Sequence, residues 1–93
     1  MPFKILIVGG AGGMGRWCAS LLKNAGQDVS ISSRGDASVI ARSLGAGVSR
    51  PEHAGDYDIV ILSVPIDAIE EAASEAAPHM RPGALLMDLS SLK

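Results

Sequence analysis

Short apolar runs alternate with stretches of helical periodicity along the chain. Residues 5–8 and 58–64 are nearly continuous apolar runs, which is typical of strands buried on both faces of a parallel sheet. Residues 29–33 alternate apolar and polar side chains and predict a further strand. Two more strands are expected, a short one at 47–49 and a final one at 84–88.

Between these runs, apolar residues recur every three or four positions, as on the buried face of a helix. The spacing predicts a helix that ends near Ala25, one from 37 to 44, and one between Asp67 and Pro78. Asp36 and Asp67 are expected to cap the second and third helices. The residues expected to face inward are Met14, Trp17, Cys18, Leu21, Leu22 and Ala25 in the first helix, Val39, Ile40 and Leu44 in the second, and Ile66, Ile69, Ala72, Ala73 and Ala76 in the third.

Three glycines stand between the first strand and the first helix in the spacing G-x-G-x-x-G. Gly10 lets the chain turn sharply off the strand, Gly12 lets a pyrophosphate approach the backbone, and Gly15 lets the helix pack closely. The first N–H groups of the helix and the positive end of its dipole then face the phosphates. This strand–turn–helix context predicts a nicotinamide dinucleotide site that includes Gly10, Ala11, Gly12, Gly13, Met14 and Gly15.

Strand–helix alternation together with this glycine turn predicts a Rossmann-type α/β fold, a doubly wound and mainly parallel sheet with helices on both faces. The expected strand order is 3-2-1-4-5, with the cofactor crossing between the first and fourth strands. Residues just beyond the fourth strand line the crevice in this architecture, so Ser63, Val64 and Pro65 are expected to touch the cofactor. His53 lies in a polar loop with no second ligand nearby, which favours a solvated side chain.

The end of the second strand indicates which cofactor is bound. NAD-binding domains carry an acid there, which accepts a hydrogen bond from the ribose 2′-hydroxyl. Ser33 holds that position here, with Ser32 before it and Arg34 after it. Two hydroxyls and a guanidinium suit a 2′-phosphate, so NADP is favoured over NAD. NAD stays the alternative, with Asp36 as a substitute acid.

Composition and charge narrow the function classes. The chain has 93 residues, enough for one small domain, and 47% of them are hydrophobic. A net charge of −2 suggests neither a nucleic-acid nor an anionic-membrane partner, and no apolar run approaches the ~20 residues of a membrane span. The single cysteine, Cys18, lies on the apolar helix face, which favours a buried thiol over a nucleophile. We expect a cytoplasmic protein without a metal site.

The chain carries few groups that could act on a substrate. A dehydrogenase needs a substrate pocket and usually an acid–base group beside the nicotinamide. The candidates here are two loop histidines and the polar residues 88–93. We therefore expect residues 1–93 to form the cofactor domain of a longer enzyme, which alone binds nucleotide and turns over nothing.

Three segments resemble the prephenate dehydrogenases, in particular archaeal ones. They are GGAGGMGRW at 9–17, SVP at 63–65 and DLSSLK at 88–93, of which the last is the most telling. The resemblance implies oxidative decarboxylation of prephenate to 4-hydroxyphenylpyruvate in tyrosine biosynthesis, a branch of aromatic amino acid biosynthesis. Ser91 then matches the family serine near the substrate hydroxyl and the catalytic histidine, and Lys93 matches the lysine of the same motif.

The resemblance also implies what lies beyond this sequence. The family's catalytic histidine, its substrate-binding arginine and its helical dimerisation domain lie downstream. The small-molecule substrate is therefore expected to bind through that missing domain, and the full-length protein is expected to be a homodimer. Ser33 and Arg34 depart from the commoner NAD-using pattern and point to an NADP-using member.

Other classes stay open. A deazaflavin-dependent NADP reductase or an imine reductase shares the glycine loop and the Ser-Arg ending of the second strand, but is not expected to carry D-x-x-S-x-K at 88–93. A non-enzymatic nucleotide-sensing domain often keeps the acid that Ser33 replaces. A structural domain without a ligand is disfavoured by the glycine spacing.

Overall fold

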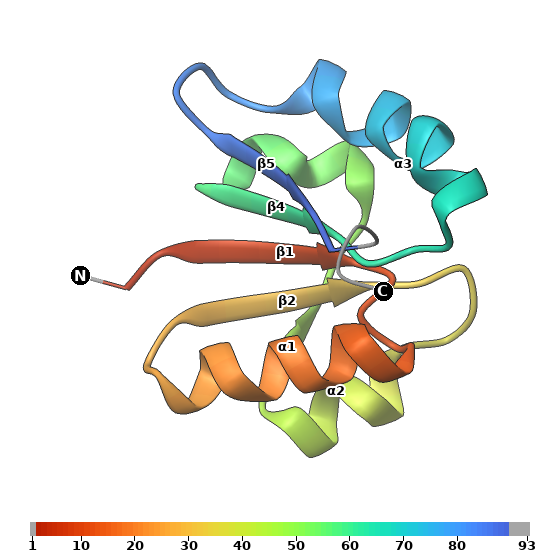
Figure 1. Cartoon of the computed structure of the whole chain (residues 1–93). Coiled ribbons are helices and arrows are strands. Elements are labelled where there is room, and N and C mark those ends of the chain that lie inside the picture. The colour runs from red at the N-terminus through yellow and green to blue at the C-terminus, as the bar shows by residue number, and fades with distance from the viewer. Residues whose placement is uncertain (1, 90–93) are drawn as a thin grey trace.

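The sheet has five parallel strands in the order β3-β2-β1-β4-β5, which confirms the predicted order (Figure 1). The structure is a computed structural model that describes residues 2–89. The strands are β1 (Lys4–Val8), β2 (Asp28–Ser32), β3 (Gly47–Val48), β4 (Ile59–Leu62) and β5 (Leu85–Asp88). Because the order reverses between β1 and β4, a crevice opens at the carboxyl ends of these two strands.

Helices cover both faces of the sheet. They are α1 (Gly13–Asn24), α2 (Ser38–Leu44) and α3 (Ile69–Ala76), with three 3₁₀ helices, η1 (Pro51–Asp56), η2 (Ile66–Ala68) and η3 (Ala77–His79). α1 and α2 pack on one face, and α3 and η1 pack on the other (Figure 1). The fold is therefore a Rossmann-type α/β fold, as the sequence predicts.

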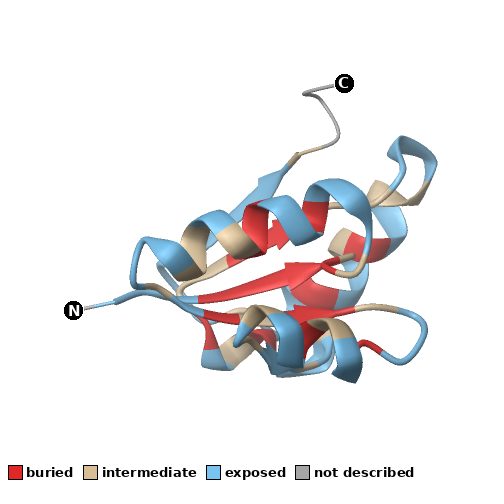
Figure 2. Cartoon of the chain, turned by 90° about the horizontal axis from the view of Figure 1, so that it is seen from below, coloured by how far each residue is buried: buried red, intermediate tan, exposed pale blue. Residues whose placement is uncertain are grey.

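Alternation along the strands divides the core into two clusters. Ile5 and Ile7 of β1 face α1 and α2, whereas Leu6 and Val8 face η1 and α3. Leu6 and Ile7 are fully buried, and Figure 2 shows the buried strands between the two helix layers. Full burial of such a side chain contributes about 1.5–3 kcal/mol. β1 therefore anchors both layers and positions the turn that follows it.

Asp58 ties together the amino-terminal ends of three strands. Its carboxylate accepts a hydrogen bond of 2.8 Å from the backbone N–H of Lys4 and forms an ion pair with Arg81. Its backbone carbonyl accepts a bond of 3.0 Å from the N–H of Leu85. The hydrogen bond from Lys4, aided by the charge of Arg81, holds the pKa of Asp58 below its usual range.

The predicted inward face of α1 is only partly buried. Cys18 is buried as predicted, and burial raises the pKa of its thiol, which disfavours the nucleophilic thiolate. The expectation that Met14, Trp17, Leu21 and Ala25 face inward is wrong, since these side chains are exposed and Trp17 is 60% accessible. α1 rests on the sheet through small residues, and the flank that carries the three large side chains lies beyond this contact.

Three expectations for the other helices are also wrong. Val39 and Ile66 are exposed rather than inward-facing. α2 has only seven residues, so its narrow buried face cannot include Val39 as well. Ile66 stands in the 3₁₀ turn η2, whose tighter winding rotates it away from the buried face of α3. Asp67 lies inside η2 and does not cap α3, because the helical backbone already begins one turn earlier.

The edge strand β5 exposes apolar side chains on the face of the sheet that carries α1. The parallel register pairs Leu85 with Ile59 and Met87 with Ile61. Ile59 and Ile61 belong to the cluster beneath α1, so Leu85 and Met87 point to the same face. Both side chains are exposed because the described helices on that face do not extend over β5.

The exposed flank of α1 borders this uncovered strip. A Cβ built on Gly45, at the end of α2, would lie 3.7 Å from Cε of Lys23, so one flank of α1 faces α2. The opposite flank carries the large apolar residues of α1 and faces β4 and β5. We call this surface the open apolar face, formed by Met14, Trp17, Leu21, Leu85 and Met87.

Candidate functional site

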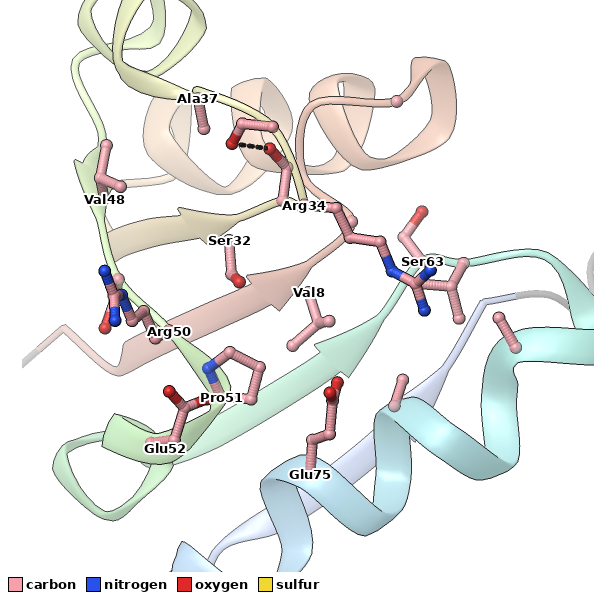
Figure 3. Close-up of a pocket in the computed structure, with 18 of the residues that line it drawn as sticks. Val8, Ser32, Arg34, Ala37, Val48, Arg50, Pro51, Glu52, Ser63 and Glu75 are labelled. Atoms are coloured by element: carbon pink, nitrogen blue, oxygen red, sulfur yellow. Dashed lines mark hydrogen bonds between the residues drawn. The ribbon is translucent and has the colours of Figure 1, made fainter.

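The carboxyl ends of β1, β2 and β4 surround a cleft of about 930 Å³ (Figure 3). It lies where the strand order reverses, which is where α/β sheets of this kind bind ligands. Of the residues predicted to bind a cofactor, it is lined by Gly12, Ser32, Ser33, Arg34, Ser63, Val64 and Pro65. The structure therefore brings together residues from the glycine turn, the end of β2 and the end of β4.

Gly9, rather than Gly10, makes the sharp turn at the end of β1. Its φ is +87°, and a Cβ there would lie 2.1 Å from the carbonyl oxygen of Ser63, so both conformation and space require glycine. Gly10 has no positive φ, but a Cβ on it would lie 2.5 Å from Cγ2 of Ile31. Gly10 thus allows close packing against β2, and the turning role predicted for it belongs to Gly9.

Backbone hydrogen bonds fix the glycine turn between its two neighbouring strands. The N–H groups of Gly9 and Gly10 donate to the carbonyl oxygen of Ser32, at 2.7 and 3.1 Å. On the other side, the N–H of Ser63 donates to the carbonyl oxygen of Val8 at 2.8 Å. The three segments that line the cleft are therefore held in a defined arrangement by the protein itself.

Open space lies in front of the first turn of α1. A Cβ on Gly12 would meet only the carbonyl oxygen of Gly9, at 3.6 Å, and one on Gly13 would meet nothing within 4 Å. α1 begins here without a side-chain cap and without an acidic residue in its first turn. Its first N–H groups and the positive end of its dipole therefore favour an anion at this point. These features fit the pyrophosphate of a dinucleotide.

The end of β2 presents two hydroxyls and a guanidinium to the cleft. Ser32 is buried in the wall, and the hydroxyl of Ser33 donates to the carbonyl oxygen of Gly35 at 2.9 Å. Nη2 of Arg34 lies 2.7 Å from Oε1 of Glu71 in α3. Figure 3 shows Arg34 reaching from the loop after β2 across the cleft. The strongly exposed guanidinium of Arg34 therefore lies where the sequence predicts that the ribose of the cofactor binds.

Asp36 stabilises the start of α2, but the N-cap residue is Ala37 and not, as the sequence predicts, Asp36. Its carboxylate accepts a hydrogen bond of 2.9 Å from the backbone N–H of Ser38, from the position before the N-cap residue Ala37. Hydrogen bonds from Ser38 hold the pKa of Asp36 below its usual range. Asp36 is the acid nearest the end of β2 and lines the cleft, but its carboxylate is hydrogen-bonded to the start of α2.

A second hollow of about 190 Å³ lies on the other side of the glycine turn. It is lined by Gly12, Gly13, Met14, Ser63, Val64, Pro65 and Leu89. Four of these residues also line the larger cleft, so the two form one crevice that runs from Arg34 to Leu89. Gly10, Ala11 and Gly15 line neither hollow, and Gly10 acts through the packing of the turn.

The far wall of the cleft contains residues that the sequence pattern did not single out. Figure 3 shows Arg50, Pro51 and Glu52 on the side of β3 and η1, and Glu75 on α3. The sequence offers one weak indication of this wall, because Arg50 follows the short strand predicted at 47–49. That strand has only two residues in the structure, which is too few to give a clear pattern in the sequence. His53 also lines the cleft and is exposed, as predicted for a solvated histidine.

Two residues that the family resemblance singles out, Ser91 and Lys93, lie outside the described residues 2–89.

Within residues 2–89, no group of three or more His, Cys, Asp or Glu side chains could hold a metal ion. Among the same residues, none of the helices is long and apolar enough to cross a membrane.

Comparison with known proteins identifies the relatives of this chain. Residues 18–93 match the family model described as "Prephenate dehydrogenase, nucleotide-binding domain". The match begins after the glycine turn, so it does not depend on that widespread motif. A Methanocaldococcus jannaschii protein named "Probable arogenate/prephenate dehydrogenase" is 41% identical to this chain in an alignment that covers 96% of it. The match covers only 21% of that relative's length, so the chain spans about a fifth of it.

Two solved structures resemble the fold. Prephenate dehydrogenase from A. aeolicus, in complex with hydroxyphenyl propionate and NAD+, is 27% identical with a TM-score of 0.76, and the match covers 95% of this chain and 33% of that one. Synechocystis arogenate dehydrogenase is 24% identical with a TM-score of 0.84, over 95% of this chain and 33% of that one. The second likeness is one of fold alone.

Proposed function

Because the chain belongs to the prephenate dehydrogenase family, in which it matches the nucleotide-binding domain, we propose that its crevice binds NADP for an oxidoreductase. The observation that carries this proposal is the geometry of the glycine turn. Gly9 and Gly10 pack so tightly that no side chain fits, whereas Gly12 and Gly13 leave open space before the first turn of α1. A phosphate group fits that space and gains the N–H groups and dipole of the helix.

The crevice has room for both halves of a dinucleotide. We propose that the adenosine half lies in the larger hollow, near Arg34, and that the pyrophosphate lies over Gly12 and Gly13. The nicotinamide half then lies in the smaller hollow, toward Leu89. Val64 and Pro65 line both hollows and would supply apolar contacts along the middle of the ligand.

NADP is proposed rather than NAD because of the charges at the end of β2. Ser32, Ser33 and Arg34 offer hydroxyls and a guanidinium, which favour a 2′-phosphate. Asp36 is the nearest acid on the cleft wall, and its carboxylate is bound to Ser38. NAD is the second candidate, because the A. aeolicus prephenate dehydrogenase is a complex with NAD+.

The reaction proposed for the complete protein is the oxidative decarboxylation of prephenate in tyrosine biosynthesis, with arogenate as the alternative substrate. The bound cofactor would accept a hydride from the substrate. This chain binds and orients that cofactor at the end of the crevice marked by Leu89. Ser91 and Lys93 follow closely in sequence, and we propose Ser91 as a residue that contacts the substrate hydroxyl.

We propose that residues 1–93 are the cofactor domain of a longer polypeptide, whose other parts bind the substrate and form a homodimer. The match to the M. jannaschii relative, which covers 21% of its length, supports this proposal. The open apolar face supports it independently, because several large apolar side chains exposed on one side of a domain usually mark an interface. A helical segment of the same polypeptide, packed beside α1 and over β5, would bury this face.

A Gly12→Val substitution tests the dinucleotide site. A Cβ at this position has room within the protein, so the fold should persist, which circular dichroism can verify. The valine side chain would fill the space proposed for the pyrophosphate, so calorimetry should detect no binding of NADPH or NADH. Wild-type affinity in a folded Gly12→Val variant would contradict the proposed site.

A further inference from the structure

An ion pair spans the proposed cofactor cleft. Arg34 follows β2, and Glu71 lies in the first turn of α3, 37 positions later in the sequence. Their side chains meet at 2.7 Å, between Nη2 and Oε1. Ser32 of β2 and Ala72 and Glu75 of α3 line the cleft, so the pair joins these two sides beside the proposed ribose site.

The ion pair is weak enough for the guanidinium of Arg34 to exchange Glu71 for another anion. The side chains of Arg34 and Glu71 are 82% and 62% accessible, and exposed ion pairs contribute little because water and salt screen them. A phosphate can instead accept two parallel hydrogen bonds from one guanidinium and carries more charge than a carboxylate. The guanidinium is therefore able to leave Glu71 for a phosphate.

We infer that Glu71 sets the cofactor selectivity of this site by competing with a 2′-phosphate for Arg34. The inference rests on the proposed NADP site. Binding of a 2′-phosphate releases the Glu71 carboxylate from the guanidinium and brings two negative groups near each other. A nucleotide with a free 2′-hydroxyl leaves the pair intact. Glu71 thus weakens binding of nucleotides that carry a 2′-phosphate and has little effect on the others.

Glu70 supplies a matched control. It precedes Glu71 in the same first turn of α3 and is also exposed, but it does not pair with Arg34. Glu70→Gln and Glu71→Gln remove the same charge from the same end of the same helix. A general effect of charge or of the helix dipole would therefore appear in both variants.

The test is a calorimetric titration with 2′,5′-ADP and with 5′-AMP, two probes that differ by the 2′-phosphate. The proteins are the wild type, Glu71→Gln, Glu70→Gln, Arg34→Ala and the double variant with both Arg34→Ala and Glu71→Gln. We expect Glu71→Gln to tighten 2′,5′-ADP binding about two- to fivefold, the range of an exposed ion pair. Binding of 5′-AMP should stay unchanged, and Glu70→Gln should behave as the wild type. In the Arg34→Ala background, Glu71→Gln should have no comparable effect.

Two results would overturn the inference while leaving the proposed function in place. The first is equal tightening by Glu70→Gln and Glu71→Gln, which would indicate a general charge effect. The second is weaker binding of 2′,5′-ADP by Glu71→Gln, which would mean that Glu71 positions Arg34 for the phosphate. If the wild type binds 5′-AMP as tightly as 2′,5′-ADP, the proposed NADP preference fails and the inference fails with it.

Discussion

A Cβ built on Gly15 would lie 2.4 Å from the carbonyl oxygen of Gly9. The first turn of α1 is therefore packed directly on the backbone turn that leaves β1. This contact sets the distance between the helix N-terminus and the strand ends around the crevice. It is the close packing that the third glycine of the motif predicts.

We expect Gly15→Ala to destabilise the fold by about 1–3 kcal/mol, since the added methyl group has no room. Urea unfolding measures the change in the free energy of unfolding. Gly13→Ala is the control, because a Cβ on Gly13 meets nothing within 4 Å. If both variants are as stable as the wild type, the tight packing inferred for Gly15 is wrong.

Arg34→Ala should weaken NADPH binding by about 1.5–3 kcal/mol, the scale of a hydrogen bond to a charged group, and leave NADH binding nearly unchanged. The reason is that only NADPH carries the phosphate proposed to meet this guanidinium. Calorimetric titration of both cofactors provides the measurement. Arg50→Ala, which changes another arginine of the same cleft, serves as the comparison. Equal losses for the two cofactors in Arg34→Ala would exclude a 2′-phosphate role.

The position of the glycine turn, and the cleft residues that this turn and the ends of β2 and β4 contribute, could be predicted from the sequence because they depend on local patterns. Buried apolar runs mark β1 and β4, and the glycine spacing marks the turn between β1 and α1. The role of Gly9 could not be read from the spacing, because the segment contains several glycines and the motif does not include this one. Its positive φ appears only in the structure.

Contacts between distant parts of the chain could not be predicted from the sequence. Periodicity marks Trp17 and Leu21 as apolar helix positions, but it does not reveal that the described elements leave this flank of α1 uncovered. Likewise, the pairing of Arg34 with Glu71 joins residues 37 positions apart and depends on how α3 packs on the sheet. Such contacts follow from tertiary structure and have no local signal.

Acid should destabilise the wild type more than an Asp58→Asn variant. Because the pKa of Asp58 is lowered in the folded state, its stabilising contribution is present above the unfolded value of about 3.9 and is lost as the pH falls through the folded value. We expect the free energy of unfolding of Asp58→Asn to be lower at pH 7 and to change less on acidification. Asp67→Asn, an exposed residue outside this cluster, is the control. Parallel pH profiles for wild type and Asp58→Asn would contradict this role.

The open apolar face should make the 93-residue chain self-associate as its concentration rises. Leu85→Lys places a charge on the edge strand within this face and should shift the chain toward the monomer in analytical ultracentrifugation. Val39→Lys changes an even more exposed apolar residue on α2, outside the face, and should have no such effect. An identical response of the two variants would contradict the assignment of this surface as an interface.

The central claim is that the crevice between the glycine turn and Arg34 binds NADP. The most direct test is calorimetric titration of the wild-type chain with NADPH and, separately, with NADH. We predict that NADPH binds at least about tenfold more tightly, a difference of about 1.4 kcal/mol. Tighter binding of NADH would contradict the cofactor assignment and favour Asp36 as the ribose ligand, and binding of neither cofactor would contradict the site itself.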